Sequence, residues 1–210
     1  MSVFLRAGPR TRALLRFLHR RARAVPSRRR PLDLSAGAKL FRRSAVVFTD
    51  TEDFTTRTAR DGILHFLMLF GRFVEGATPV LARVQGTVVK VEGDSLMLRF
   101  DDPGTACRGV VALERHLRLV NAGLPANERL RFSYGVGFGD LLEIEGDLFG
   151  LEVNLASKLG EDLAGHGQIL LTPAAVSGLD QQTLRRVVPY GTIRFGKRPI
   201  RVGRFLPPRH

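Results

Sequence analysis

The sequence has a single cysteine, Cys107, and no tryptophan. One cysteine excludes an intramolecular disulfide and is typical of proteins kept in a reducing compartment, so a cytoplasmic location is expected. No stretch approaches the 18 or more consecutive apolar residues of a membrane span. Hydrophobic residues make up 44% of the chain and charged residues 25%, which are values of a globular domain that buries a core.

Acidic residues are scarce in the N-terminal part of the chain. Of the 33 Lys and Arg, 13 lie in residues 1–43, where Asp33 is the one acid. The remaining 167 residues hold 20 basic and 19 acidic side chains, so this body is almost neutral. The net charge of +13 therefore belongs to an arm. A basic groove across the fold is not supported, and nucleic acid is not an expected partner.

Residues 1–43 are predicted to be a basic arm with one amphipathic helix and a Pro/Arg linker around Pro26 and Pro31. On a helical wheel, one side carries Leu14, Leu15, Phe17, Leu18, Ala22 and Val25, and the other carries Arg12, Arg16, His19, Arg20 and Arg23. Such a helix lies on an anionic membrane surface or docks in the groove of a protein partner. A solvated leader and an Arg-rich organellar transit peptide are the alternatives.

Residues 44–210 are predicted to form one α+β domain. Strands are expected at 44–48, 84–91, 95–100 and 130–137, and helices at 57–81 and 103–120. This β-α-β-β-α-β order is the ferredoxin-like arrangement, an antiparallel sheet with both helices on one face. A short strand at 141–144, an added helix at 153–163, a strand at 168–171 and a terminal β-hairpin at 187–205 follow.

The stretch FTDTEDFT, residues 48–55, places Asp50, Glu52 and Asp53 directly after the first buried strand. In the predicted topology this strand end lies beside the hairpin that contains Asp94. Two carboxylates brought together repel each other unless a cation lies between them. Mg²⁺ typically takes one or two carboxylates plus substrate phosphates, so a metal site for a polyphosphate is predicted. Capping of a helix and a turn by the two aspartates is the alternative.

Three motifs, in order, resemble those of the class III nucleotidyl cyclases, in their compact bacterial form. They are Phe48-Thr49-Asp50-x-x-x-Phe54-Thr55, the KVEGD stretch at 90–94, and GDLFGLEVNLASKL at 146–159. The resemblance runs from about residue 44 to 206. It implies a lyase that forms a 3′,5′-cyclic nucleotide and pyrophosphate in a head-to-tail homodimer, with two composite sites at the interface.

The resemblance also implies which residues hold the metals and the phosphates. Asp50, Asp94 and the carbonyl of Thr51 would bind two Mg²⁺ or Mn²⁺ ions. Backbone N–H groups from Glu52 to Thr55, at the start of the next helix and including those of Phe54 and Thr55, would hold the triphosphate.

Lys90 and Asp147 resemble the pair that reads the base from the opposite protomer. Lys90 would donate to adenine N1 and Asp147 would accept from the exocyclic amine. Guanine reverses both groups and leaves donor facing donor and acceptor facing acceptor, which costs on the order of 1–3 kcal/mol for each unpaired group. ATP is therefore the expected substrate and cyclic AMP the expected product.

Two positions depart from the family pattern. Asn154 resembles the residue that orients the ribose, but the arginine that the family places four residues later is Lys158 here, which lacks the planar fork of donors. Asp53 stands where the family usually has glycine in the phosphate loop. These departures leave an alternative open, a catalytically weak module that binds nucleotide or pairs with another cyclase chain.

Overall fold

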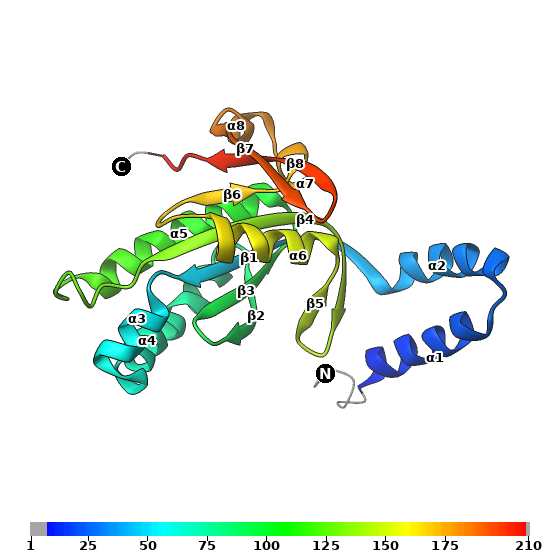
Figure 1. Cartoon of the computed structure of the whole chain (residues 1–210), viewed down its shortest axis with the longest axis horizontal. Coiled ribbons are helices and arrows are strands. Elements are labelled where there is room, and N and C mark those ends of the chain that lie inside the picture. The colour runs from blue at the N-terminus through cyan, green and yellow to red at the C-terminus, as the bar shows by residue number, and fades with distance from the viewer. Residues whose placement is uncertain (1–7, 209–210) are drawn as a thin grey trace.

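The computed structural model describes residues 8–208, and an eight-stranded sheet forms its centre (Figure 1). The strand order is β2 (Thr87–Glu92), β3 (Ser95–Phe100), β1 (Phe41–Thr51), β4 (Phe132–Ile144), β6 (Ile169–Leu171), β8 (Arg198–Phe205) and β7 (Val187–Phe195). A short strand, β5 (Asp147–Phe149), pairs with β4 outside this path. Among the first four strands each neighbouring pair is antiparallel, in the ferredoxin-like order, which confirms the predicted α+β core.

Helices cover both faces of the sheet. Since side chains alternate along a strand, Ala45 and Val47 of β1 point to the face covered by α4 (Ile63–Ala82) and α5 (Pro103–Asn121), where the largest core cluster lies. Val46 points to the opposite face, where α6 (Leu151–Ser157) packs through Val153. A π-helical turn, η2 (Lys158–Leu163), continues α6.

Several element boundaries differ from the prediction. The single helix expected at 57–81 is two helices, α3 (Phe54–Asp61) and α4, which are separated at Gly62 with a φ of 85° that glycine adopts readily. The strands expected at 130–137 and 141–144 form one continuous strand, β4. Two short helices near the C-terminal hairpin, α7 (Pro173–Ser177) and α8 (Gln181–Leu184), were not expected.

No membrane-spanning segment was expected, because the sequence contains no long run of consecutive apolar residues. By length and composition, however, helix α4 is apolar enough to cross a membrane. Its buried residues, however, supply the main core: Phe66, Leu69, Phe70, Phe73, Ala77 and Leu81. One side of the helix therefore packs against the sheet and α5, whereas Leu64, Leu67 and Met68 are exposed.

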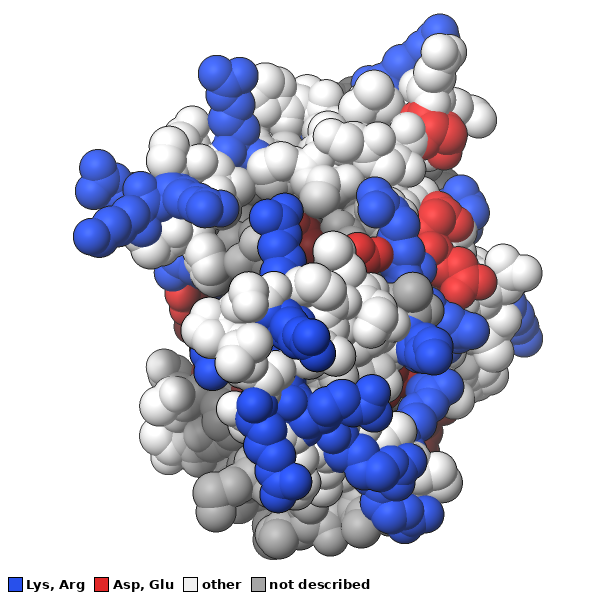
Figure 2. Space-filling model, turned by 90° about the vertical axis from the view of Figure 1, so that its right-hand side faces the viewer, with Lys and Arg blue, Asp and Glu red and all other residues white. Residues whose placement is uncertain are grey.

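The N-terminal arm is a helical hairpin that projects from the body (Figure 1). The first helix, α1 (Pro9–Arg23), confirms the predicted basic amphipathic helix and ends before Pro26. The expected Pro/Arg linker is wrong, because the segment forms a second helix, α2 (Pro26–Leu40), with Pro31 inside it. Arg21 holds the two helices together through two hydrogen bonds to Asp33, of 2.6 and 3.0 Å. Figure 2 shows the Lys and Arg side chains gathered over this end of the molecule.

Candidate active site

The end of β1 and the β2–β3 hairpin are joined at the predicted metal site. The Thr51 hydroxyl donates to the backbone carbonyl of Asp94 at 2.8 Å. The Ser95 hydroxyl reaches a carboxylate oxygen of Asp50 at 3.4 Å, and the Leu96 N–H donates to the Thr49 hydroxyl at 2.9 Å. These contacts place Asp50 and Asp94 together, as the topology predicted.

The electrostatics of this carboxylate pair fit a cation. Burial, followed by the charges of Asp94 and Glu161, raises the pKa of Asp50 to about 6. Burial also raises the pKa of Asp94. Both carboxylates thus lie half-buried in a field that disfavours their charged forms, which is the environment that a divalent ion reverses. Across residues 8–208, no group of three or more His, Cys, Asp or Glu is arranged to hold a metal ion. A two-carboxylate site suits Mg²⁺ or Mn²⁺ completed by substrate oxygens better than a closed structural site.

The start of α3 has the geometry of an anion-binding helix end. Asp53 is its N-cap residue, adopts φ 61° and ψ 24°, and makes no capping hydrogen bond through its side chain to any described residue. The first-turn N–H groups, those of Phe54 and Thr55 among them, have no acceptor within the helix. The expectation for the N–H of Glu52 is wrong, because this group already donates to the Arg131 carbonyl at 2.9 Å.

The side chains around this turn are structural. The Phe54 ring packs edge-on against Phe66 with 4.8 Å between ring centroids, so only its backbone is placed to meet a ligand. The buried Arg57 guanidinium donates to the carbonyls of Glu128 and Arg129 at 2.6 Å each. These contacts fix the position of the turn relative to β1.

The predicted base-reading pair forms an ion pair in the structure. Lys90 Nζ lies 3.4 Å from Asp147 Oδ2, which joins β2 to β5. Glu92 lies closer, at 2.7 Å, and its hydrogen bond is the main cause that raises the pKa of Lys90, with Asp147 adding to it. Glu92 was not predicted as a site residue. Its position two residues after Lys90 on the same strand could have indicated that the two side chains meet.

Asn154 and Lys158 lie one helical turn apart, as their spacing predicted. The Lys158 N–H donates to the Asn154 carbonyl, and the Asn154 side chain is exposed. Lys158 Nζ is held by Asp162 at 2.8 Å. A Cβ at Gly135 of β4 would lie 2.0 Å from the Ala156 carbonyl oxygen, so this glycine lets α6 and η2 rest directly on the sheet.

Asp50 and Lys90 lie on one face of the sheet, the face that α6 covers in part. Lys90 pairs across the strands with Met97, which packs in the α6-side cluster. Lys90, Ser95 and Glu161 line one small cavity of about 100 Å³ on this face. Ser95 and Glu161 were not predicted as site residues. Glu161 follows the third motif by two positions, and only the turn of η2 brings its charge toward Asp50.

The sequence and the fold resemble those of known proteins. No family profile matches the sequence. An adenylate cyclase of Streptomyces griseus is 34% identical over 118 residues, which cover 56% of this chain and 28% of the relative. The matched part amounts to between 22% and 31% of the length of the curated relatives.

Solved structures match more of the chain. An adenylate/guanylate cyclase/hydrolase from Silicibacter pomeroyi is 26% identical with a TM-score of 0.65, covering 80% of this chain and 98% of that one. The adenylyl cyclase CyaB from P. aeruginosa is 20% identical with a TM-score of 0.67, covering 80% of this chain and 97% of that one. The fold is thus that of nucleotidyl cyclase catalytic domains. Within that class, the chain has the catalytic-domain fold of the class III adenylyl and guanylyl cyclases, which confirms the resemblance seen in the sequence.

Proposed function

We propose that the protein is an adenylyl cyclase that converts ATP to 3′,5′-cyclic AMP and pyrophosphate at composite sites of a head-to-tail homodimer. The observation that carries the proposal is the pairing of Asp50 with Asp94 at the strand end, on the same sheet face as the Lys90–Asp147 pair. The first pair suits a metal-bound triphosphate, and the second suits the ring edge of adenine.

The cation would be bound by Asp50, Asp94 and the carbonyl of Thr51. Two Mg²⁺ or Mn²⁺ ions bound there would activate the ribose 3′-hydroxyl and neutralise the leaving pyrophosphate. The raised pKa of Asp50 fits this function, because a carboxylate that resists ionisation alone gains most from an adjacent cation.

The other side chains act on the substrate directly. Lys90 donates to adenine N1 and Asp147 accepts from the exocyclic amine, which leaves guanine with two mismatched groups. Asn154 orients the ribose, and the Lys158 ammonium offsets charge that develops on the α-phosphate. First-turn N–H groups of α3 hold the phosphates.

A homodimer is proposed because the site is open on a single chain. Apolar side chains beside the base-reading and ribose residues face solvent: Phe149 is 37% exposed and Leu151 is 59% exposed. A second protomer placed head-to-tail over this face would bury them and bring its own Lys90 and Asp147 to the carboxylate pair.

A second candidate function has its own observation. Lys158 is bonded to Asp162, so the cation that replaces the family arginine is partly neutralised. A catalytically weak module that binds nucleotide, or pairs with another cyclase chain, would fit this arrangement.

Cyclic nucleotide formation by the purified protein with Mn²⁺ separates the two functions. The adenylyl cyclase proposal predicts cyclic AMP from ATP, little product from GTP, and loss of activity in Asp50→Ala. Asp101→Asn is the matched control, because Asp101 is exposed. A folded dimer that binds ATP but yields no product would establish the weak module instead. A gain of activity in Lys158→Arg would show that the lysine limits the rate.

A further inference from the structure

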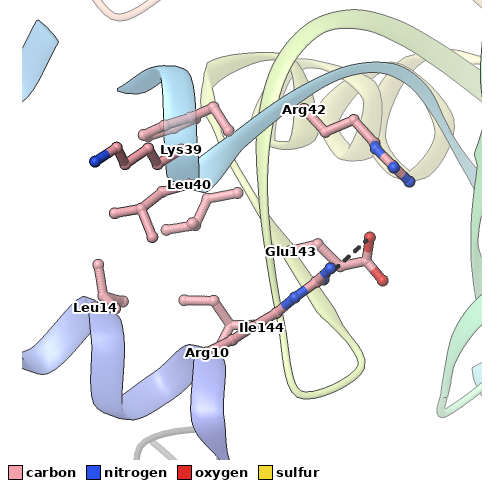
Figure 3. A pocket seen from close by; sticks show the side chains of 9 residues that line it. Arg10, Leu14, Lys39, Leu40, Arg42, Glu143 and Ile144 are labelled. Carbon is pink, nitrogen blue, oxygen red and sulfur yellow. Dashed lines mark ion pairs between the residues drawn. The ribbon is translucent and has the colours of Figure 1, made fainter. Parts of the chain in front are cut away.

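The N-terminal arm is anchored to the body near the start of α1. The buried Thr11 hydroxyl donates to a carboxylate oxygen of Glu145 at 3.1 Å. Leu14 is buried next to it and lines a cavity of about 200 Å³ together with Leu40 and Ile144 (Figure 3). This part of the apolar face is therefore occupied by the body and is not available to a partner.

The rest of the arm carries positive charge that its own acid cannot balance. The helices α1 and α2 contain ten Lys and Arg but one acid, Asp33. Asp33 is already bound by Arg21 through both carboxylate oxygens. Figure 2 shows the basic side chains spread over the surface of this end of the molecule. An anionic partner is the chemistry that this surface fits.

The distal half of the arm also contains a groove lined by both basic and apolar residues. The groove has a volume of about 1290 Å³ and lies between the two helices near the turn that joins them. Its basic residues are Arg16, His19, Arg20, Arg23 and Arg28, and its apolar residues are Ala24, Val25, Pro31 and Leu32. Apolar and cationic groups therefore alternate at the end of the hairpin that lies farthest from the sheet (Figure 1).

Exposed apolar side chains lie in the same two helices and in the turn between them. Val25, in the turn, is 58% exposed, Leu34 of α2 is 70% exposed and Leu18 of α1 is 38% exposed. Apolar residues ringed by arginines are typical of surfaces that enter the headgroup region of a bilayer, where the arginines meet lipid phosphates and the apolar groups leave water. A nucleic-acid backbone would satisfy the arginines but would leave Val25 and Leu34 in water.

We propose that the tip of the arm, formed by the C-terminal half of α1 and the N-terminal half of α2, docks on an anionic lipid surface. The contact is peripheral: arginines bind phosphate headgroups and the turn at Val25 inserts shallowly. The hydrogen bond between Thr11 and Glu145 fixes the arm to the body, and the body faces the aqueous side. The proposal concerns the arm alone and stands whether or not the body is an adenylyl cyclase.

Sedimentation of the full chain with vesicles tests the proposal. The protein is expected to bind phosphatidylcholine vesicles that contain phosphatidylserine, to bind far less to pure phosphatidylcholine, and to dissociate as salt is raised. In the tip variant, Arg16, Arg20, Arg23 and Arg28 are each changed to glutamine. Each arginine charge that is removed is expected to weaken binding to the anionic vesicles about fivefold. Val25→Ser is expected to weaken it further at every salt concentration.

A charge-matched control separates the tip from net charge. Arg185, Arg194, Arg198 and Arg201, which are exposed on α8, β7 and β8 or next to them, are each changed to glutamine. This variant is expected to bind anionic vesicles like the unmodified protein. Equal weakening of both variants would overturn the proposal. Tighter binding to duplex DNA than to anionic vesicles at the same salt concentration would assign the arm to nucleic acid, and a vesicle-independent loss of self-association in the tip variant would assign it to a second copy of the chain.

Discussion

The Thr51 hydroxyl donates to the carbonyl of Asp94 at 2.8 Å, and this bond ties the end of one strand to a hairpin 43 positions further along the chain. Thr51 is 3% exposed, so the bond is shielded from water. Because Asp50 precedes Thr51 directly, the bond sets how closely the two carboxylates approach. The geometry of the proposed metal site therefore depends on a hydroxyl that is not itself a metal ligand.

Replacing Thr51 by valine removes this bond and keeps the Thr51 carbonyl in place. We expect cyclase activity to fall about tenfold or more, since groups that orient metal ligands contribute on this scale. The Mn²⁺ concentration for half-maximal activity should rise in parallel. Thr51→Ser, which keeps the hydroxyl, should retain most activity. Equal activity in the valine and serine variants would show that the bond does not position the site.

Replacing Asp53 by glycine should strengthen nucleotide binding at the phosphate loop. The backbone there is left-handed with φ 61°, a conformation that costs an ordinary L-residue about 1–2 kcal/mol and glycine very little. The change also removes an anion next to the proposed triphosphate. We expect KM for the nucleotide to fall and the free energy of unfolding to change by no more than about 1 kcal/mol.

Asp53→Asn separates the two effects, because asparagine is neutral and tolerates the left-handed region. A lower KM in both variants would assign the effect to charge, and a lower KM in the glycine variant alone would assign it to the backbone. A higher KM in both variants would mean that Asp53 assists substrate binding, contrary to the proposal.

The core elements of the fold could be predicted from hydrophobic periodicity. β3 has its predicted bounds, and α5 begins at Pro103 after the Asp102 N-cap as expected. The break at Gly62 was missed because the apolar spacing continues through it. The second helix of the arm was missed because prolines argue against helix, whereas Pro26 occupies the first turn, where its missing N–H costs nothing.

The site was predictable only as a set of residue types. Motif spacing indicated Asp50, Asp94, Lys90 and Asp147, and the structure brings each pair together. The approach of Glu161 to Asp50 depends on the π-helical turn, which no local pattern indicates. No function could be assigned to Gly135 from the sequence, because this glycine is required for a tertiary contact, the close approach of α6 and η2 to β4.

Gly135→Ala should destabilise the domain strongly. An added Cβ would meet the Ala156 carbonyl oxygen at 2.0 Å and the Gly160 nitrogen at 2.5 Å, and both are backbone atoms that cannot move aside. We expect a loss of about 3 kcal/mol or more in the free energy of unfolding, measured by urea denaturation. At Gly139 the nearest atom is the flexible Glu152 side chain at 2.9 Å, so Gly139→Ala should cost about 1 kcal/mol or less. Similar losses in the two variants would contradict the close packing of α6 on β4.

The N-cap of α5 should give a pH-dependent contribution to stability. Burial raises the pKa of Asp102, but hydrogen bonds from the Thr105 hydroxyl and N–H outweigh it and hold the pKa below its usual value. A lowered native pKa stabilises the fold above the unfolded value of about 3.9, and this contribution is lost as the pH falls through the native pKa.

Asp102→Asn should therefore lower the free energy of unfolding by about 0.5 kcal/mol at neutral pH, because solvent screens the charge of this exposed side chain, and by less in acid. Urea denaturation at the two pH values measures the difference. Asp101→Asn, at the adjacent exposed position, should show no such dependence. A cost for Asp102→Asn that is independent of pH would mean that the charge of the cap is unimportant.

Mixing two inactive variants tests the central claim most directly. Asp50→Ala removes a proposed metal ligand and Lys90→Ala removes the proposed base reader, and each homodimer should be inactive. If one site takes Asp50 from one protomer and Lys90 from its partner, half of the dimers in an equal mixture regain one intact site. Cyclic AMP formation should then recover to about a quarter of the unmodified rate. A mixture that stays as inactive as its components, although the protomers are shown to exchange, would contradict the composite site.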